Sequence, residues 1–180
     1  MKILVTYAST YGATEGIAGR IADRLRAAGF DVVALPVRAA GDVSEYHAFV
    51  IGSAAYFGHW LKGATEFVHG HLAELADRPT WLFSSGPLGT EATDAQGRDQ
   101  HVAAEPKEIA EFREAIHPRG DHVFFGAMDP GKLGLRDRAV RTLPAGRGLL
   151  PEGDFRDWPE IDAWADSIAR ELAPAPVSRG

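Results

Sequence analysis

Short apolar runs recur along the chain at fairly regular intervals, and the segments between them space their apolar residues differently. The runs at residues 3–7 and 48–53 are apolar almost throughout, which is typical of strands buried on both faces of a sheet. Five strands are predicted in all, at residues 3–7, 31–37, 48–53, 80–85 and 122–127. Pro36 lies inside the second run, which favours an edge position for that strand.

Apolar residues in the intervening segments recur every three or four positions, as in helices with one buried face. Helices are predicted at residues 17–28, 61–75, 107–116 and 158–172. Gly29 is expected to end the first helix, and Asp157 or Pro159 to begin the last. Strands that alternate with helices in this way predict an α/β domain with an open, doubly wound parallel sheet and helices on both faces. In such sheets the ligand lies beyond the carboxyl ends of the strands.

Two segments depart from this alternation. Residues 90–106 are polar and irregular, which predicts a long surface loop. Residues 129–148 carry five basic and two acidic residues among apolar ones, and residues 133–143 are predicted to form a basic helix. Such a helix can contact anionic lipid or an acidic ligand, or it can simply be a solvated helix over the sheet. Residues 1–172 are expected to form one domain, followed by a flexible tail at residues 173–180.

The composition narrows the chemistry available to the chain. It contains no cysteine, which excludes disulfides, thiolate catalysis and cysteine-based metal sites. The net charge of −6 argues against a nucleic-acid-binding protein. His69 and His71 are two positions apart on a predicted helix and face different sides, so we expect no metal site. No apolar run approaches the roughly 18 residues of a membrane span. The chain enters a strand at once, which predicts that it has no signal peptide.

The turn after the first strand has the composition of a phosphate-binding loop. It brings hydroxyl groups and one glycine to the start of the next helix, where backbone N–H groups have no intrahelical partner and the helix dipole favours an anion. The candidate residues are Ser9, Thr10, Tyr11, Gly12, Ala13 and Thr14. The alternative is an ordinary helix start at which Thr14 or Ser9 caps the backbone.

Three other kinds of phosphate site do not fit this turn. A nucleoside-triphosphate loop needs a lysine, which is missing after Gly12. A dinucleotide fingerprint needs several glycines, and the turn has only one. A phospho-receiver domain needs acidic residues where the first strand ends, and Tyr7, Ala8 and Ser9 stand there instead. The remaining possibility is a phosphate monoester held by hydroxyls and amides without a cation.

Two further loops are predicted at the same edge of the sheet. The one after the third strand is rich in aromatic residues and consists of Ala54, Ala55, Tyr56, Phe57, Gly58, His59 and Trp60. The one after the fourth strand contributes Ser84, Ser85, Gly86 and Gly89. Aromatic side chains stack on flat rings, and glycines let backbone groups reach a ring edge. The set suits a phosphorylated ligand with a flat ring, although the aromatic residues could instead cover the top of a helix.

The order of elements and the three loops resemble the flavodoxin fold with bound FMN. The phosphate loop of that family is commonly T/S-x-T-G-x-T, which Ser9, Gly12 and Thr14 match, while Tyr11 replaces the middle threonine. The stretch from residue 51 to residue 68 is similar to the menaquinone-dependent protoporphyrinogen oxidase branch of flavodoxin-like proteins. Gly58-His59 followed by an aromatic residue, and Glu66-Phe67-Val68 in the next helix, carry that similarity.

The resemblance implies a five-stranded parallel sheet with strand order 2-1-3-4-5, and FMN as the cofactor. It places a backbone group of Gly58 at flavin N5, and Tyr56 or Trp60 against the isoalloxazine ring. Contacts to the pyrimidine edge or the ribityl chain fall to Ser84, Ser85 and Gly86. His59 is the tentative catalytic residue, because an imidazole beside the ring can transfer protons near neutral pH. It can equally stabilise the loop.

The resemblance leaves three functions open. The first is an FMN-dependent oxidoreductase that passes electrons from a reduced substrate, such as a porphyrinogen, to a quinone or another carrier. The second is a flavodoxin-type electron carrier without its own small-molecule substrate. The third is a protein that has lost FMN because of Tyr11. The expected partners are a small-molecule donor or a redox protein, with no nucleic acid. The expected location is cytoplasmic, with an alternative at the inner membrane face through residues 132–147.

Overall fold

The computed structural model describes residues 1–89, 93, 96–129, 131, 134 and 152–174. The basic helix predicted at residues 133–143 lies outside these residues, apart from Gly134. The tail predicted at residues 173–180 also lies outside them, apart from its first two residues.

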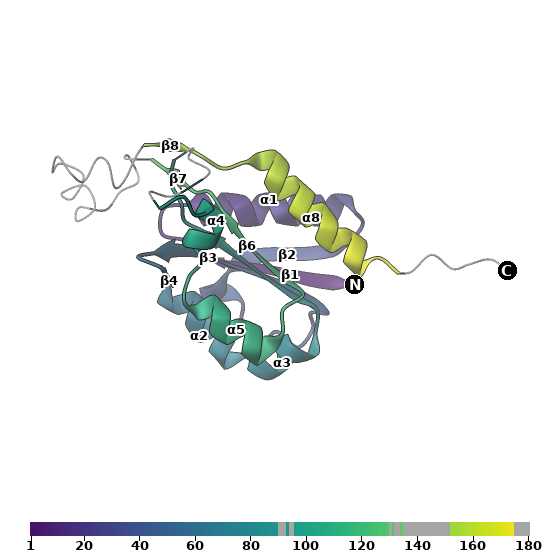
Figure 1. Ribbon diagram of the computed structural model, residues 1–180. Helices are drawn as coiled ribbons and strands as arrows, with labels where there is room; N and C mark the ends of the chain where they lie inside the picture. Colours follow the sequence, from purple (N-terminus) through teal and green to yellow (C-terminus); the bar gives the residue numbers. More distant parts are fainter. Residues whose placement is uncertain (90–92, 94–95, 130, 132–133, 135–151, 175–180) are drawn as a thin grey trace.

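A parallel sheet of five strands forms the centre of the molecule (Figure 1). The strands are β1 (Lys2–Ala8), β2 (Asp31–Pro36), β3 (Ala48–Tyr56), β5 (Thr80–Ser85) and β6 (Gly120–Phe124). Their order across the sheet is β2-β1-β3-β5-β6, and all four pairings are parallel. The order 2-1-3-4-5 is therefore confirmed. β2 is an edge strand, as the position of Pro36 predicts.

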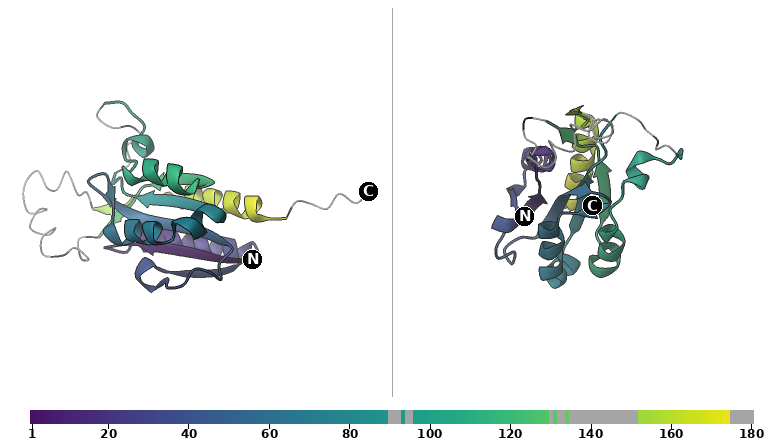
Figure 2. Two further views of the ribbon diagram at one scale, coloured as in Figure 1. Left: turned by 90° about the horizontal axis from the view of Figure 1, so that it is seen from below. Right: turned by 90° about the vertical axis from the view of Figure 1, so that its left-hand side faces the viewer.

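Helices cover both faces of this sheet (Figures 1 and 2). One face carries α1 (Ala13–Ala27) and α8 (Trp158–Leu172). The other face carries α2 (Lys62–Gly70), α3 (Leu72–Asp77) and α5 (Glu108–Ile116). An apolar cluster fills the space between the sheet and the helices on each face, because side chains of a strand point alternately to the two faces. The described residues thus form a single three-layer α/β domain.

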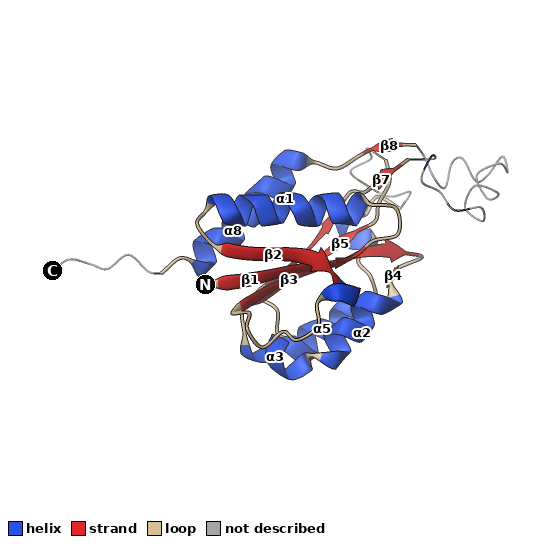
Figure 3. Cartoon of the chain, turned by 180° about the vertical axis from the view of Figure 1, so that it is seen from behind, coloured by secondary structure: helices blue, strands red, loops and turns tan. Residues whose placement is uncertain are grey.

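Three smaller elements complete the described chain. The strand β4 (His59–Trp60) pairs antiparallel with the end of β3. The strands β7 (Ala127–Met128) and β8 (Gly153–Asp154) form a separate antiparallel pair near the carboxyl edge of the main sheet (Figure 3). The short helix α4 (Gln100–Ala103) lies against β6, and the Asp99 carboxylate caps its first turn.

The structure corrects several predicted boundaries. The helix predicted at residues 61–75 is two helices, because the chain breaks at His71, where the ring Nδ1 lies 2.8 Å from the Phe67 carbonyl oxygen. The predicted loop at residues 90–106 contains α4. The fifth strand spans residues 120–124 rather than 122–127, since the Gly126 N–H donates to the Pro87 carbonyl instead of to the sheet.

The last helix follows its predicted bounds closely. Asp157 is its N-cap residue and accepts a hydrogen bond from the Glu160 N–H at 3.0 Å. Two pairs of side chains then fix α8 to α1, namely Arg20 with Asp162 and Arg24 with Asp166. Each arginine meets its carboxylate through two nitrogens, which gives the pair a defined geometry.

Gly19 offers a test of the α1 layer, because it lies inside the helix and a Cβ atom built there has no neighbour within 4 Å. Replacing glycine by alanine in a helix interior stabilises it by about 0.5–1 kcal/mol. We expect Gly19→Ala to raise the free energy of unfolding, measured by urea denaturation, by about that amount. Gly29→Ala is the control. Its φ of +93° strains any side chain, so it should lower the free energy instead. Equal effects of the two changes would contradict this account.

Candidate functional site

The three predicted loops lie side by side at the carboxyl edge of the sheet (Figure 3). The end of β1 is in register with β3 through Ala8 and Ser53, and β3 is in register with β5 through Ala54 and Ser85. β2 pairs with β1 on one side, whereas β3, the next strand along the chain, pairs with β1 on the other side. This reversal of strand order opens a crevice above the strand ends, where ligands of such sheets bind.

The first loop is built around Gly12. Its φ of +90° is a left-handed conformation that glycine adopts without strain. Its N–H donates to the Ser9 Oγ at 3.0 Å, and its carbonyl accepts the Gly16 N–H at 3.0 Å to begin α1. Gly12 is the N-cap residue, and no side chain in the described part of the chain caps the helix. The alternative in which Ser9 or Thr14 serves as an ordinary cap is therefore wrong.

The hydroxyl of Thr14 is the best indication of an anion site. Thr14 is 1% exposed, and among the described residues its Oγ1 has no hydrogen-bond partner. A buried hydroxyl without a partner costs about 1–3 kcal/mol. It lies in the first turn of α1, beside N–H groups that have no partner within the helix. These donors fit a phosphate group, because its oxygens would accept their hydrogen bonds.

Arg156 lies near this loop, a position that sequence reasoning missed. Its Nη1 is 3.5 Å from the Ala13 carbonyl oxygen, and its guanidinium lies 4.5 Å from the centre of the Trp158 ring. Two further nitrogens pair with the Asp154 carboxylate at 2.7 and 2.6 Å. Arg156 is therefore a cation close to the predicted phosphate loop, and Asp154 neutralises its charge. That the loop holds a phosphate by hydroxyls and amides alone stays a prediction. No pattern in the sequence joins residues 143 positions apart.

A cleft of about 330 Å³ runs beside the phosphate loop. Residues 11–13 line one side of it, and the β7–β8 pair with Arg156 lines the other. Tyr11 faces this cleft and is partly buried, while Thr10 is exposed. The tyrosine that departs from the family pattern therefore lies toward the cleft, and Thr14 remains buried beneath the loop.

The second loop is a tight hairpin rather than an irregular loop. β3 continues to Tyr56, and Tyr56 pairs with His59 across the turn. The two turn residues, Phe57 and Gly58, have φ values of +51° and +74°. A positive φ is rare for phenylalanine and marks a constrained turn. Phe57 is 101% exposed, so its ring covers no helix and is presented at the carboxyl edge.

Trp60 is buried and does not line the surface of the site. It is 4% exposed, packs against Phe112 with ring centres 5.4 Å apart, and donates its indole N–H to the Ser84 Oγ at 2.8 Å. Of the two residues expected to stack on a flavin ring, Trp60 is therefore buried, and Tyr56 is the one that is partly exposed. Ser84 is 1% exposed and serves to anchor this indole. Phe57, which precedes Gly58, is the aromatic residue that the turn exposes.

The start of α5 holds the hairpin in place, which the sequence did not indicate. The Lys107 N–H donates to the Gly58 carbonyl at 3.0 Å. The Glu108 carboxylate lies 2.7 Å from the His59 Nδ1 and accepts the Trp60 N–H at 3.1 Å. Because a carboxylate only accepts, His59 donates from Nδ1. The ring is about half exposed, so its position is compatible with a role in stabilising the loop and with a role as a proton carrier.

The third loop approaches the hairpin closely at Gly86. A Cβ built at Gly86 would lie 3.2 Å from the Ala55 Cβ, so the two loops touch there. Ser85 is 4% exposed, and the Gly86 N–H donates to the Phe124 carbonyl at 3.2 Å. Gly89 has a φ of +120° and a partly exposed position. The loop thus lies against the hairpin at Ala55, with Gly86 at the contact.

Glu108 gives the hairpin a pH dependence. Burial raises the pKa of its carboxyl, but the hydrogen bonds from His59 and from the Trp60 N–H outweigh burial and hold the pKa below its ordinary value. A lowered pKa in the folded state contributes stability above the unfolded-state pKa, and this contribution disappears as the pH falls through the folded-state pKa.

We therefore expect Glu108→Gln to lower the free energy of unfolding by about 1 kcal/mol at neutral pH. The difference should shrink as the pH falls and vanish below the folded-state pKa of Glu108, which lies under its ordinary value. Urea denaturation at neutral pH and across the acid range measures it. Glu111→Gln on the same helix is the control, since Glu111 is 61% exposed where it meets His69 and its loss should cost little throughout this range. A cost for Glu108→Gln that persists at low pH would contradict this origin.

No helix in the described part of the chain is long and apolar enough to span a membrane. The segment 132–147, predicted to contact a membrane, lies outside the described residues apart from Gly134.

Residues 4–143 match the flavodoxin domain family. A search of the curated proteins gave no match.

Solved structures with the same fold include several flavodoxins. Oxidised flavodoxin 2 from Bacillus cereus is 19% identical with a TM-score of 0.61, over 96% of this chain and 100% of that one. A flavodoxin from the domain Archaea is 17% identical with a TM-score of 0.58, over 95% and 98% of the two chains. The rubredoxin oxygen:oxidoreductase of Desulfovibrio gigas is 16% identical with a TM-score of 0.59. The match covers 95% of this chain and only 36% of that larger one.

Proposed function

The chain belongs to the flavodoxin domain family, whose cofactor is FMN, and we propose that it is an electron-transfer protein that carries FMN over the carboxyl ends of β1, β3 and β5. The observation that carries this proposal is the buried hydroxyl of Thr14 at the start of α1, which has no hydrogen-bond partner among the residues that the structure describes. Bound FMN supplies a ring that accepts and releases electrons. The protein supplies the binding, the orientation and the surroundings of that ring.

Each loop has a separate part in this proposal. The hydroxyl of Thr14 and the first-turn N–H groups of α1 receive the phosphate. Phe57 offers its exposed ring to the flat face of the cofactor, and Tyr56 stands next to it on the same hairpin. The wall formed by Ala55 and Gly86 excludes water from the other side of the crevice.

The exposure of the hairpin favours an electron carrier that binds redox partner proteins. The Phe57 side chain and Gly58 are exposed, so no described segment closes over the ring position. α4, the described helix within residues 90–106, lies against β6. A redox partner can therefore approach the cofactor edge directly. The flavodoxins with the same fold are matched over 98–100% of their length, which is compatible with a protein of this kind.

An oxidoreductase acting on a reduced substrate, with a quinone or another carrier as the acceptor, is the second candidate. His59 favours it, because the imidazole is half exposed beside Gly58 and pairs with Glu108 through Nδ1, so that Nε2 is the nitrogen that would accept a proton. An enzyme that removes hydrogen from a small molecule needs a proton acceptor at this place, and an electron carrier does not. A porphyrinogen is the substrate suggested by the resemblance of residues 51–68.

The visible spectrum of the purified protein tests FMN binding, which both candidate functions require. We expect a yellow protein, or a colourless one that takes up FMN in equimolar amount and binds riboflavin, which lacks the phosphate, more weakly by about tenfold or more. A protein that takes up no FMN overturns both candidates. Equal affinity for the two flavins overturns the phosphate site at Thr14.

Two assays then separate the candidates in the FMN-loaded protein. Rapid electron exchange with a one-electron acceptor protein, without oxidation of a porphyrinogen in the presence of a menaquinone analogue, supports the carrier. Catalytic oxidation of the porphyrinogen supports the enzyme, and in that case His59→Gln should lower the rate by about a hundredfold. His69→Gln serves as the control, since His69 also pairs with a glutamate but is on α2, away from the hairpin.

A further inference from the structure

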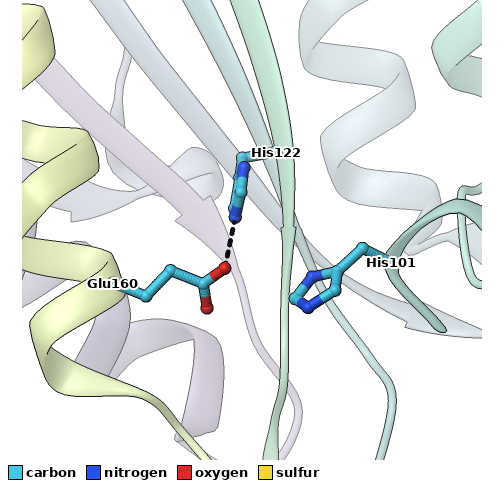
Figure 4. A group of neighbouring side chains, drawn as sticks. All are labelled: His101, His122 and Glu160. Carbon is cyan, nitrogen blue, oxygen red and sulfur yellow. Dashed lines mark hydrogen bonds and ion pairs between the residues drawn. The ribbon is translucent and has the colours of Figure 1, made fainter. Parts of the chain in front are cut away.

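Three side chains that could bind a metal ion lie next to β6 and point toward one another (Figure 4). His101 comes from α4, His122 from β6 and Glu160 from the first turn of α8. One donor atom of each lies within 4.8 Å of the donor atoms of the other two. All three residues are partly buried, so the group is neither a core packing cluster nor a freely solvated one.

The distance between two of the donors is already close to that of a metal site. His122 Nε2 lies 3.0 Å from Glu160 Oε1. Two ligands on a tetrahedral ion with bonds of 2.0–2.2 Å are about 3.3–3.6 Å apart. An ion could therefore replace the hydrogen bond between these atoms with little movement of either side chain.

His101 is oriented as metal-binding histidines commonly are. Its Nδ1 lies 2.6 Å from the Val123 carbonyl oxygen, and a carbonyl only accepts hydrogen bonds. Nδ1 therefore holds the ring proton, and Nε2 of the neutral ring keeps its lone pair for a ligand. A hydrogen bond from the second ring nitrogen to a backbone carbonyl fixes both the tautomer and the ring plane of a ligand histidine.

The surroundings restrict the two imidazoles further. The His101 ring packs edge-on against Phe125 at 5.0 Å between centres, and the His122 ring lies 4.5 Å from Phe124. The Trp164 ring of α8 also lies near His122, with ring centres 6.2 Å apart. The N–H of Glu160 is held by the Asp157 cap, so the start of α8 is fixed as well. Preorganised donors of this kind lose little conformational freedom on binding an ion.

We propose that His101, His122 and Glu160 bind a divalent transition metal ion of the zinc type. Two imidazole nitrogens and one carboxylate oxygen suit zinc and its neighbours, whereas calcium and magnesium prefer oxygen ligands. Water completes the coordination. The ion links α4 to β6 and α8, and so fixes the chain before Lys107 and Glu108, which hold the Gly58 hairpin.

Zinc titration of the full chain, free of any polyhistidine tag and pretreated with a chelator, tests this site. Isothermal calorimetry should show one zinc ion bound per chain, thermal unfolding should shift upward with zinc, and cobalt should give the visible bands of a nitrogen- and oxygen-ligated ion. His101→Gln and Glu160→Gln should each weaken zinc binding by about tenfold or more. Because His101 is on a short surface helix, His101→Gln should keep the fold, which circular dichroism verifies.

His69→Gln is the matched control. His69 Nε2 also lies near a glutamate oxygen, at 2.8 Å from Glu111, but the described residues supply no third donor there. It should leave zinc affinity unchanged. Absence of zinc binding by the wild-type chain at millimolar concentration overturns the proposal. Equal loss of affinity in His101→Gln and His69→Gln, or none in either, overturns it as well.

Discussion

Replacing Thr14 by valine should have opposite effects on FMN binding and on stability. Valine keeps the shape of the side chain but lacks the hydroxyl, which is buried and unpartnered among the described residues. Loss of a hydrogen bond to a charged phosphate is expected to raise the FMN dissociation constant about tenfold to a hundredfold. Removal of an unsatisfied buried hydroxyl should raise the free energy of unfolding of the cofactor-free protein by about 1 kcal/mol.

Fluorescence titration with FMN and urea denaturation of the cofactor-free protein measure the two effects. Thr14→Ser is the matched control, since it keeps the hydroxyl and should keep most of the affinity. Unchanged FMN affinity in the valine variant would show that the phosphate lies elsewhere. A fall in the stability of the cofactor-free valine variant would show that Thr14 already has a partner in that state.

Gly52→Ala is expected to be the most destabilising of the single changes considered. Gly52 lies in β3 opposite Phe83 in β5. A Cβ at this position would come within 2.0 Å of the Phe83 Cζ, and real Cβ atoms do not approach other atoms so closely. Phe83 is fully buried, and its ring packs against Phe124 and Trp164. The ring cannot turn away without disturbing that cluster, so we expect a loss of about 3 kcal/mol.

Gly16→Ala is a suitable control, because its Cβ would also be too close to a neighbour. That neighbour is the terminal Nη1 of Arg156, at 2.4 Å. A flexible side chain can move aside, so the cost should stay below about 1 kcal/mol. Urea denaturation of both variants measures the difference. The double change Gly52→Ala with Phe83→Leu should cost less than the sum of the two single changes. Strict additivity would show that Phe83 is not the obstacle.

The parts of the site that could be predicted from the sequence are those encoded in one short stretch of chain. Ser9, Gly12 and Thr14 lie within six residues, at the point where an apolar run gives way to a helical pattern. Local chemistry at such a turn is sufficient to indicate an anion site. Phe57 and Gly58 could be placed at the edge of the sheet for the same reason, but not given their individual roles.

The sequence was a poorer guide wherever a residue had two possible surroundings. Trp60 and Phe57 are both aromatic and belong to the same hairpin, yet one is buried against Phe112 and the other is fully exposed. Trp60 lies in β4, which was not predicted, whereas Phe57 lies in the turn before it at a positive φ. His71 likewise fits a helical pattern, although its ring meets the Phe67 carbonyl and the helix ends there.

The sequence by itself determined the strands and most of the helices, because periodicity encodes them, and the strand order through the resemblance. The phosphate loop, which neighbouring residues suggest, stays a prediction. Only the tertiary structure decided that Arg156 lies beside α1, that Glu108 holds the hairpin, and that His101, His122 and Glu160 meet. Those contacts join residues from 21 to 143 positions apart. Packing of the sheet and its helices brings them together, and no local pattern records how two distant side chains will be oriented.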